Sequence, residues 1–202
     1  MRKNFLFKFI VFATFVLLNV FIFKSLKLLI LELVLLTIFG FLYSKKAKKT
    51  ILEIKSKKIR GNFKAIFIAD YHSNPADGVL EIIKSEAEDS VFVFLGGDIV
   101  DDKAKDYNVD ELFSAIGERE TFYVIGNHEV RRKDLTELIN YFKNNLTYLS
   151  RKTSPISISN FEIYGIDDAT VNESDFNYSL LYFKETLDNE KFNILLVHRP
   201  EY

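Results

Sequence analysis

Residues 91–101 read VFVFLGGDIVD, an apolar run that ends in two glycines and a carboxylate. Five apolar residues that are β-branched or aromatic in the main, bounded by glycine, are typical of a strand buried on both faces. Gly96 and Gly97 would let the backbone turn sharply at the end of this strand, so that Asp98 points into a crevice. The stretch therefore predicts a buried strand that presents a carboxylate at its carboxyl end.

Similar apolar runs occur elsewhere in the chain. FKAIFIA (63–69), TFYVI (121–125) and NILLV (193–197) predict strands buried on both faces, and FEIYG (161–165) predicts a further strand. Stretches with helical spacing occupy residues 79–88, 109–116, 134–144 and 179–187, and Asn108 with Glu111 and Asp134 with Glu137 are acceptable helix start signals. Alternating strands and helices favour a layered α/β domain with a largely parallel central sheet.

Polar side chains follow each of the four strongest strands. They are Asp70 and His72, then Asp98, then Asn127 and His128, and finally His198. Ligand sites in open α/β sheets lie beyond the carboxyl ends of the strands, so these groups are expected to converge on one crevice. Carboxylate, imidazole and amide ligands suit Mn, Fe or Zn. Two such ions about 3.5 to 4 Å apart would activate a hydroxide for attack on a phosphoryl group.

Four short motifs carry a family resemblance. DYH (70–72), GGDIVD (96–101), GNHE (126–129) and HRPE (198–201), each after a predicted strand, resemble successive motifs of the calcineurin-like metallophosphoesterase superfamily. The chain is similar in particular to the bacterial membrane-tethered branch of that superfamily, in which a short membrane segment precedes the catalytic domain. The resemblance covers residues 63–202. It implies a metallophosphoesterase-type α/β sandwich that uses two divalent metal ions to hydrolyse a phosphoester or pyrophosphate bond.

The resemblance also implies roles for individual residues. Asp70 and His72 would bind the first metal, Asp98 would bridge both metals, and Asn127 and His198 would bind the second. His128 matches a catalytic histidine that is not a ligand; it contacts the phosphate and can protonate the leaving oxygen, as suits an imidazole near neutral pH.

Four further carboxylates of the motifs and their surroundings have no assigned role. Asp101 and Glu129 fit supporting or loop-capping roles as well as direct ones, so they stay outside the predicted ligand set. GIDDA (165–169) resembles a loop common in the membrane-tethered branch, but an ordinary turn explains its two aspartates equally well.

In the family, a further strand and a G-H-x-H motif follow the fourth motif and add one histidine to each metal. The sequence ends at Tyr202, before such a motif. It is therefore expected to be either a fragment of a longer phosphohydrolase or a truncated, catalytically impaired pseudoenzyme that acts as a binding or regulatory membrane protein. A third hypothesis is a membrane-interaction protein whose N-terminal part is the functional one. The coding sequence after Tyr202 would distinguish these readings.

Residues 1–43 have the composition of a membrane element. Residues 5–23 and 28–43 are apolar runs separated by KSLK, and a helix of about 20 residues crosses a hydrocarbon core of about 30 Å. They predict a transmembrane hairpin, followed by a basic juxtamembrane linker at 44–61 and the phosphoesterase domain at 62–202. A signal peptide followed by a buried helix, or one crossing followed by an interfacial helix, are the other interpretations.

The distribution of charge predicts the orientation. Residues 1–60 hold 13 Lys and Arg and 2 acidic residues, whereas residues 61–202 hold 14 and 26, and eight of the basic residues lie between 44 and 60. Since the most positive flank stays in the cytoplasm, we predict a multi-pass cell-membrane protein with a cytoplasmic catalytic domain and a basic segment against anionic headgroups.

The remaining composition limits the possible partners. The absence of cysteine excludes disulfides and thiolate metal sites. Few aromatic residues are interleaved with the lysines, so nucleic acid is not an expected partner. A phosphorylated substrate is expected, and a membrane tether makes a lipid-linked one plausible, but no residue selects among monoesters, diesters and pyrophosphates.

Overall fold

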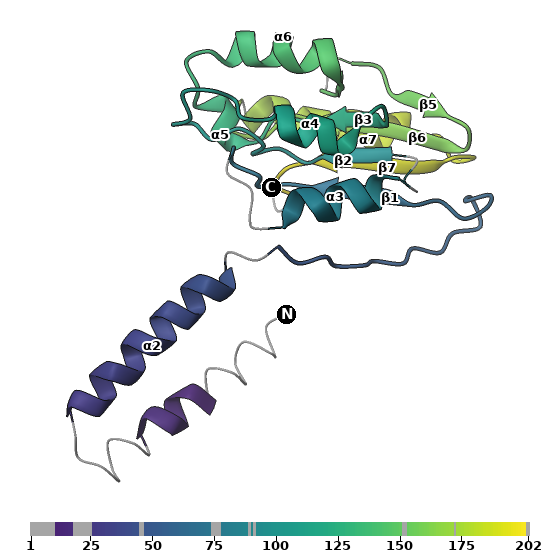
Figure 1. Cartoon of the computed structure of the whole chain (residues 1–202). Helices are drawn as coiled ribbons and strands as arrows, with labels where there is room; N and C mark the ends of the chain where they lie inside the picture. Colours follow the sequence, from purple (N-terminus) through teal and green to yellow (C-terminus); the bar gives the residue numbers. More distant parts are fainter. Residues whose placement is uncertain are drawn as a thin grey trace. The chain divides into compact units, whose positions relative to one another are not determined.

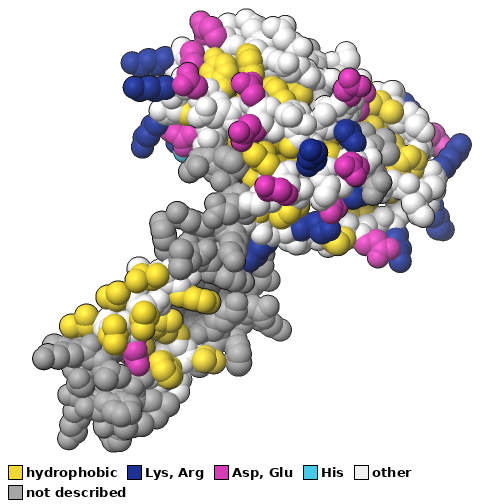
Figure 2. All heavy atoms as spheres, viewed as in Figure 1, with side chains coloured by type: hydrophobic (Ala, Val, Ile, Leu, Met, Phe, Trp, Pro, Cys, Tyr) yellow, Lys and Arg dark blue, Asp and Glu magenta, His cyan; other side chains and the backbone are white. Residues whose placement is uncertain are grey.

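The computed structural model describes residues 11–17, 26–44, 47–73, 78–88, 90, 92–150, 153–171 and 173–200. The chain divides into two compact units, Met1–Ala47 and Lys48–Tyr202. In the first unit residues 11–17 are helical, and α2 spans Leu26–Ser44 (Figure 1). Hydrophobic side chains gather on α2, where Ile30, Leu35 and Phe39 are exposed (Figure 2).

The predicted hairpin is described only in part. Of its first run, residues 5–23, only residues 11–17 are described, and the rest lies outside the described residues. Within the described part of the chain, no helix has both the length and the apolar character needed to cross a membrane.

The second unit contains two sheets. The first has the order β1-β2-β3-β4, and all its strands are parallel: Ala65–Ile68, Phe92–Leu95, Glu120–Tyr123 and Thr147–Tyr148. The second has the order β5-β6-β7: Ile156–Ile158 runs antiparallel to Phe161–Ile166, which runs parallel to Phe192–Val197. The helices are α3 (Val79–Ala87), α4 (Asp110–Ile116), α5 (Asn127–Val130), α6 (Leu135–Asn145) and α7 (Glu173–Thr186) (Figure 1).

Successive side chains of β2 point to opposite faces of the first sheet, and each face packs against a different layer. Val93 and Leu95 pack with residues of α3, α4 and α6, whereas Phe92 and Phe94 pack against the second sheet. The face of the second sheet that does not meet β2 packs on α7 through a small cluster around Ile166 and Phe176. The unit is therefore an α/β sandwich of two sheets with helices outside, as the family resemblance implied, whereas the strand pattern alone had indicated one central sheet.

Three details differ from the sequence predictions. β1 is not buried on both faces, because it forms an edge of its sheet and Phe67 is 62% exposed, whereas all of β2 is buried. The predicted start of α4 is wrong by one residue: Val109 is the N-cap, and Asn108 has a left-handed φ of 51°. Asp134 is the N-cap of α6, but its carboxylate binds Arg132 and makes no cap hydrogen bond.

Candidate metal centre

The parallel register brings three of the four motifs together at the carboxyl ends of the strands in the first sheet. Ile68 pairs with Leu95, and Leu95 pairs with Tyr123, so the three strands end level. Backbone pairing continues into the loops, where the N–H of Asp70 donates to the Gly97 carbonyl (3.2 Å) and that of His72 to the Asp98 carbonyl (3.0 Å). The loops after β1 and β2 therefore run side by side, which places their polar side chains together.

The backbone just beyond the carboxyl ends of these strands is strained and tightly packed. Asp70, His72 and Asp98 have φ values of 55°, 52° and 53°, a region that costs a non-glycine residue roughly 1–3 kcal/mol. At Gly97, where φ is 86°, an added Cβ would lie 2.8 Å from the backbone of Gly126 and 2.9 Å from the ring of His198. Such strain concentrates where a protein holds functional groups, and here it occurs at three predicted ligands. This supports a functional site at the carboxyl ends of the strands.

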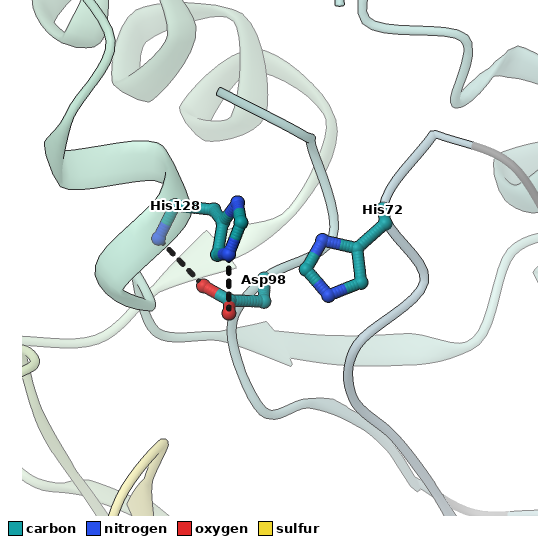
Figure 3. Close-up of side chains that lie close together, drawn as sticks. All are labelled: His72, Asp98 and His128. Carbon is teal, nitrogen blue, oxygen red and sulfur yellow. Dashed lines mark hydrogen bonds and ion pairs between the residues drawn. The ribbon is translucent and has the colours of Figure 1, made fainter. Parts of the chain in front are cut away.

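Asp98 lies at the centre of the cluster. Its carboxylate is buried, accepts the backbone N–H of His128 on Oδ1 (2.8 Å), and places Oδ2 4.0 Å from Nε2 of His128 (Figure 3). The same Oδ2 lies 3.2 Å from Nε2 of His198. Each residue of the set Asp70, Asp98 and His198 offers a ligand atom within 4.8 Å of the others, and so does each of the set His72, Asp98 and His128. A third set of this kind is Asp101, Asp102 and His128. Asp98 belongs to two of the three sets, as a carboxylate that bridges two ions would. The sets group Asp70 with His198 and His72 with His128, whereas the predicted grouping was Asp70 with His72 and Asn127 with His198.

His198 joins this cluster from the second sheet. Its Nδ1 lies 2.8 Å from the Gly96 carbonyl and its Nε2 3.2 Å from Oδ1 of Asn127. Because a carbonyl only accepts, Nδ1 carries a proton, which directs Nε2 toward Asp98 and Asn127. Burial lowers the pKa of His198, but the hydrogen bonds to Asp98 and Gly96 outweigh it and raise the pKa to about 9. A metal that bound Nε2 would therefore have to displace a proton.

His72 and His128 form the other side of the cluster. Their rings pack edge to face with centroids 4.6 Å apart, and each Nδ1 lies 3.7 Å from the same Oδ2 of Asp101. Nδ1 of His128 is also 3.4 Å from Asp102. Both Nδ1 atoms are buried and lack a hydrogen bond. Asp101 thus lies between two imidazoles, in a supporting position.

Glu129, whose role the sequence left open, caps the loop after β2. It is fully buried, and its carboxylate accepts backbone N–H groups from Asp98 (2.9 Å), Ile99 (2.5 Å), Val100 (2.9 Å) and Gly126 (2.9 Å). Burial raises the pKa of Glu129, while the N–H groups oppose that rise. Because both oxygens are used by the backbone, Glu129 holds the loop that carries Asp98 and does not face the cluster.

Arg132 was missed by the sequence analysis. This buried side chain donates from Nη1 to the carbonyls of Asp101 (2.7 Å) and Ala104 (2.9 Å), and it binds Asp134 through Nε and Nη2 (2.9 Å each). It therefore holds the segment that presents Asp101 and Asp102 to His128. Its one sequence signal is its position just after GNHE, and that position does not identify a partner.

Comparison with known families agrees with this geometry. The family model of the calcineurin-like phosphoesterases matches residues 63–202, which is more than half of the chain. A search of curated proteins finds no match. Proteins of this family hydrolyse phosphoesters and use two divalent metal ions, and the mixed carboxylate and imidazole groups around Asp98 fit such ions.

Proposed function

The chain belongs to the calcineurin-like phosphoesterase family, and from that premise we propose a membrane-anchored phosphohydrolase that cleaves a phosphoester or pyrophosphate bond. The observation that carries the catalytic part is the position of Asp98, which two candidate ligand sets share. Asp70 and His72 would hold the first ion, Asp98 would bridge, and Asn127 and His198 would hold the second. When bound, the two ions supply an activated hydroxide and neutralise the phosphoryl oxygens.

The other residues of the cluster would orient and move protons. We assign to His128 the transfer of a proton from Nε2 to the leaving oxygen of the substrate, a task suited to imidazole near neutral pH. Support for this role comes from the carboxylates of Asp101 and Asp102, which lie 3.7 Å and 3.4 Å from Nδ1 of His128 and so orient the ring with Nε2 toward Asp98 and the candidate metal centre. Glu129 and Arg132 would keep the two loops in place while the reaction proceeds.

The bridging role of Asp98 leads to a test by metal content. Asp98→Asn should lose more bound Mn than Asp101→Asn, because Asp98 belongs to two of the three candidate ligand sets and Asp101 to one. The measurement is elemental analysis of the purified full chain after loading with Mn²⁺ and desalting. Equal metal content in the two variants would remove the bridging role from Asp98.

We propose that residues 5–23 and 28–43 anchor the protein in the cell membrane, with residues 62–202 in the cytoplasm. The apolar character of both runs and the eight basic residues between 44 and 60 support this placement. Exposed apolar side chains on α2, such as Leu31, Leu35 and Phe39, are compatible with a lipid-facing helix. Such an anchor would bring the metal centre close to lipid-linked phosphates, the substrate class we favour.

Topology can be tested with two reporters fused after Tyr202. A reporter that is active only outside the membrane should stay silent, and one that folds only in the cytoplasm should be active. The reason is the cost of moving the basic segment 44–60 across the bilayer. The matched control replaces Lys45, Lys46, Lys48 and Lys49 by glutamine, which should increase the external signal. Strong external activity of the unmodified fusion would contradict the cytoplasmic placement.

A further inference from the structure

The candidate metal centre is built across two sheets. Asp70, Asp98 and Asn127 follow strands of the first sheet, whereas His198 follows β7 of the second. Apolar packing between the sheets has little directional preference, because it depends mainly on buried area. A metal site requires its ligands to be held within about 0.5 Å of the productive geometry. Some directional contact between the two sheets is therefore needed at this end of the sandwich.

A partly buried ion pair at the end of the second sheet, together with a backbone hydrogen bond to the first sheet, provides such a contact. Arg199 comes directly after His198, and its Nε and Nη2 bind Oδ2 (2.6 Å) and Oδ1 (2.5 Å) of Asp168, two residues beyond the end of β6. The Asp168 side chain is fully buried and also accepts the N–H (2.9 Å) and Oγ1 (2.6 Å) of Thr170. Its position is thus fixed by its own turn, and its planar two-point contact fixes the Arg199 guanidinium.

The same residue is tied to the first sheet. The backbone N–H of Asp168 donates to the carbonyl of Ile125 (3.3 Å), just before Gly126 and Asn127. Asp168 therefore contacts both the chain that leads to Asn127 and the residue that follows His198. Burial raises the pKa of Asp168, but the Arg199 guanidinium and Thr170 outweigh it and hold the pKa below its usual value. The pair is accordingly ionised at neutral pH.

We propose that Asp168 and Arg199 are positioning residues that hold the His198 imidazole against Asp98 and Asn127, so that one of the two metals is bound tightly only while their contact is intact. This inference rests on the proposed function. It gives a role to the fully buried carboxylate in GIDDA, where an apolar side chain would avoid the cost of burying a charge. It also gives HRPE a second functional residue.

A second ion pair between the same strands offers a matched control. Lys191, just before β7, binds Glu162 near the start of β6, with Nζ 2.6 Å from Oε2. Both pairs join β6 to β7, but only the Asp168 pair lies at the end that carries His198. A merely structural role predicts similar effects from the two pairs, whereas a positioning role predicts an effect on metal binding from Asp168 alone.

The experiment compares Asp168→Asn with Glu162→Gln in the full chain, using Mn²⁺ as the probe. Asp168→Asn should bind one of the two ions about 10- to 100-fold more weakly than the wild type does, the usual effect of removing a partner that orients a ligand. Glu162→Gln should keep both affinities. Electron paramagnetic resonance reports the bound metals independently of the stability of the fold. The wild type should show a spin-coupled Mn pair, and Asp168→Asn should show an isolated ion at the same concentrations.

Arg199→Lys is the second variant, and it remains informative if Asp168→Asn does not fold. Lysine keeps the charge but cannot make the planar two-point contact, so the weaker ion should again be lost while the melting temperature stays near that of Glu162→Gln. If the wild type binds two Mn ions and both Asp168→Asn and Arg199→Lys bind them equally well, the positioning role is overturned and the proposed function stands. If the wild type binds no Mn, both are overturned.

Discussion

Replacing Glu129 by alanine is expected to unfold the domain of residues 62–202, or to leave it only marginally stable. The substitution leaves four backbone N–H groups of the Asp98 loop and Gly126 without their acceptor. An unsatisfied buried donor costs about 1–3 kcal/mol, and a domain is stable by only about 5–15 kcal/mol. The sum for four donors is comparable with the whole stability. Thermal and urea unfolding followed by circular dichroism would measure the loss.

Two variants serve as controls for this result. Glu129→Gln keeps one acceptor oxygen and the shape of the side chain but turns a donor toward N–H groups, so its stability should lie between those of alanine and the wild type. Glu137→Ala removes an exposed glutamate from the first turn of α6 and should change the free energy of unfolding by less than about 0.5 kcal/mol. If Glu129→Ala had the same free energy of unfolding as the wild type, the loop would not depend on this carboxylate.

The Glu129 cap illustrates what the sequence could predict. The four-residue motif GNHE marked a functional loop, but a glutamate after a histidine is compatible with a ligand, a loop cap or a surface residue. Only the approach of the loop after β2, 29 to 31 residues away in sequence, decides among these roles. Contacts of this kind depend on how two loops pack, which no local pattern encodes.

The strands show the same limit. VFVFL and FKAIFIA have similar apolar patterns, and both form strands where expected. The first lies inside its sheet, whereas the second forms an edge with Phe67 largely exposed. An apolar run reports the tendency to form a strand, but the number of neighbours is set by topology. For this reason the strand pattern predicted the α/β class and most of the strands but not the division into two sheets, which only the family resemblance implied.

At the candidate site, the sequence placed polar groups after the right strands but could not show how closely their side chains approach one another. The rule that parallel strands end at one edge was sufficient for Asp70, Asp98 and Asn127. It said nothing of the pair formed by Asp168 and Arg199, although GIDDA and HRPE had each been singled out, because their separation of 31 residues matches no spacing rule. Left-handed backbone at Asp70, His72 and Asp98 was equally invisible, since aspartate and histidine adopt many conformations.

His128→Ala should reduce turnover by about 10²- to 10⁴-fold, the usual contribution of a general acid, while most of the bound Mn remains. The reason is that Nε2 of His128 would donate the proton on which departure of the leaving oxygen depends, whereas the five predicted ligands remain in place. The measurement is turnover of a phosphoester at saturating Mn²⁺, expressed per bound metal. This readout separates a lost proton donor from a lost ion.

The choice of substrate sharpens this prediction. A nitrophenyl ester has a leaving oxygen that departs without much protonation, so His128→Ala should slow it least, whereas an alkyl ester of the same phosphate should be slowed most. Asp101→Asn and Asp102→Asn should produce smaller losses with the same dependence on the leaving group, because their carboxylates lie beside Nδ1 of His128 and only orient the ring.

Nε2 of His128 also lies 4.0 Å from Asp98, within one of the candidate ligand sets. If His128→Ala lost metal in proportion to activity, and slowed both esters equally, His128 would be a ligand and the proton would have to come from elsewhere.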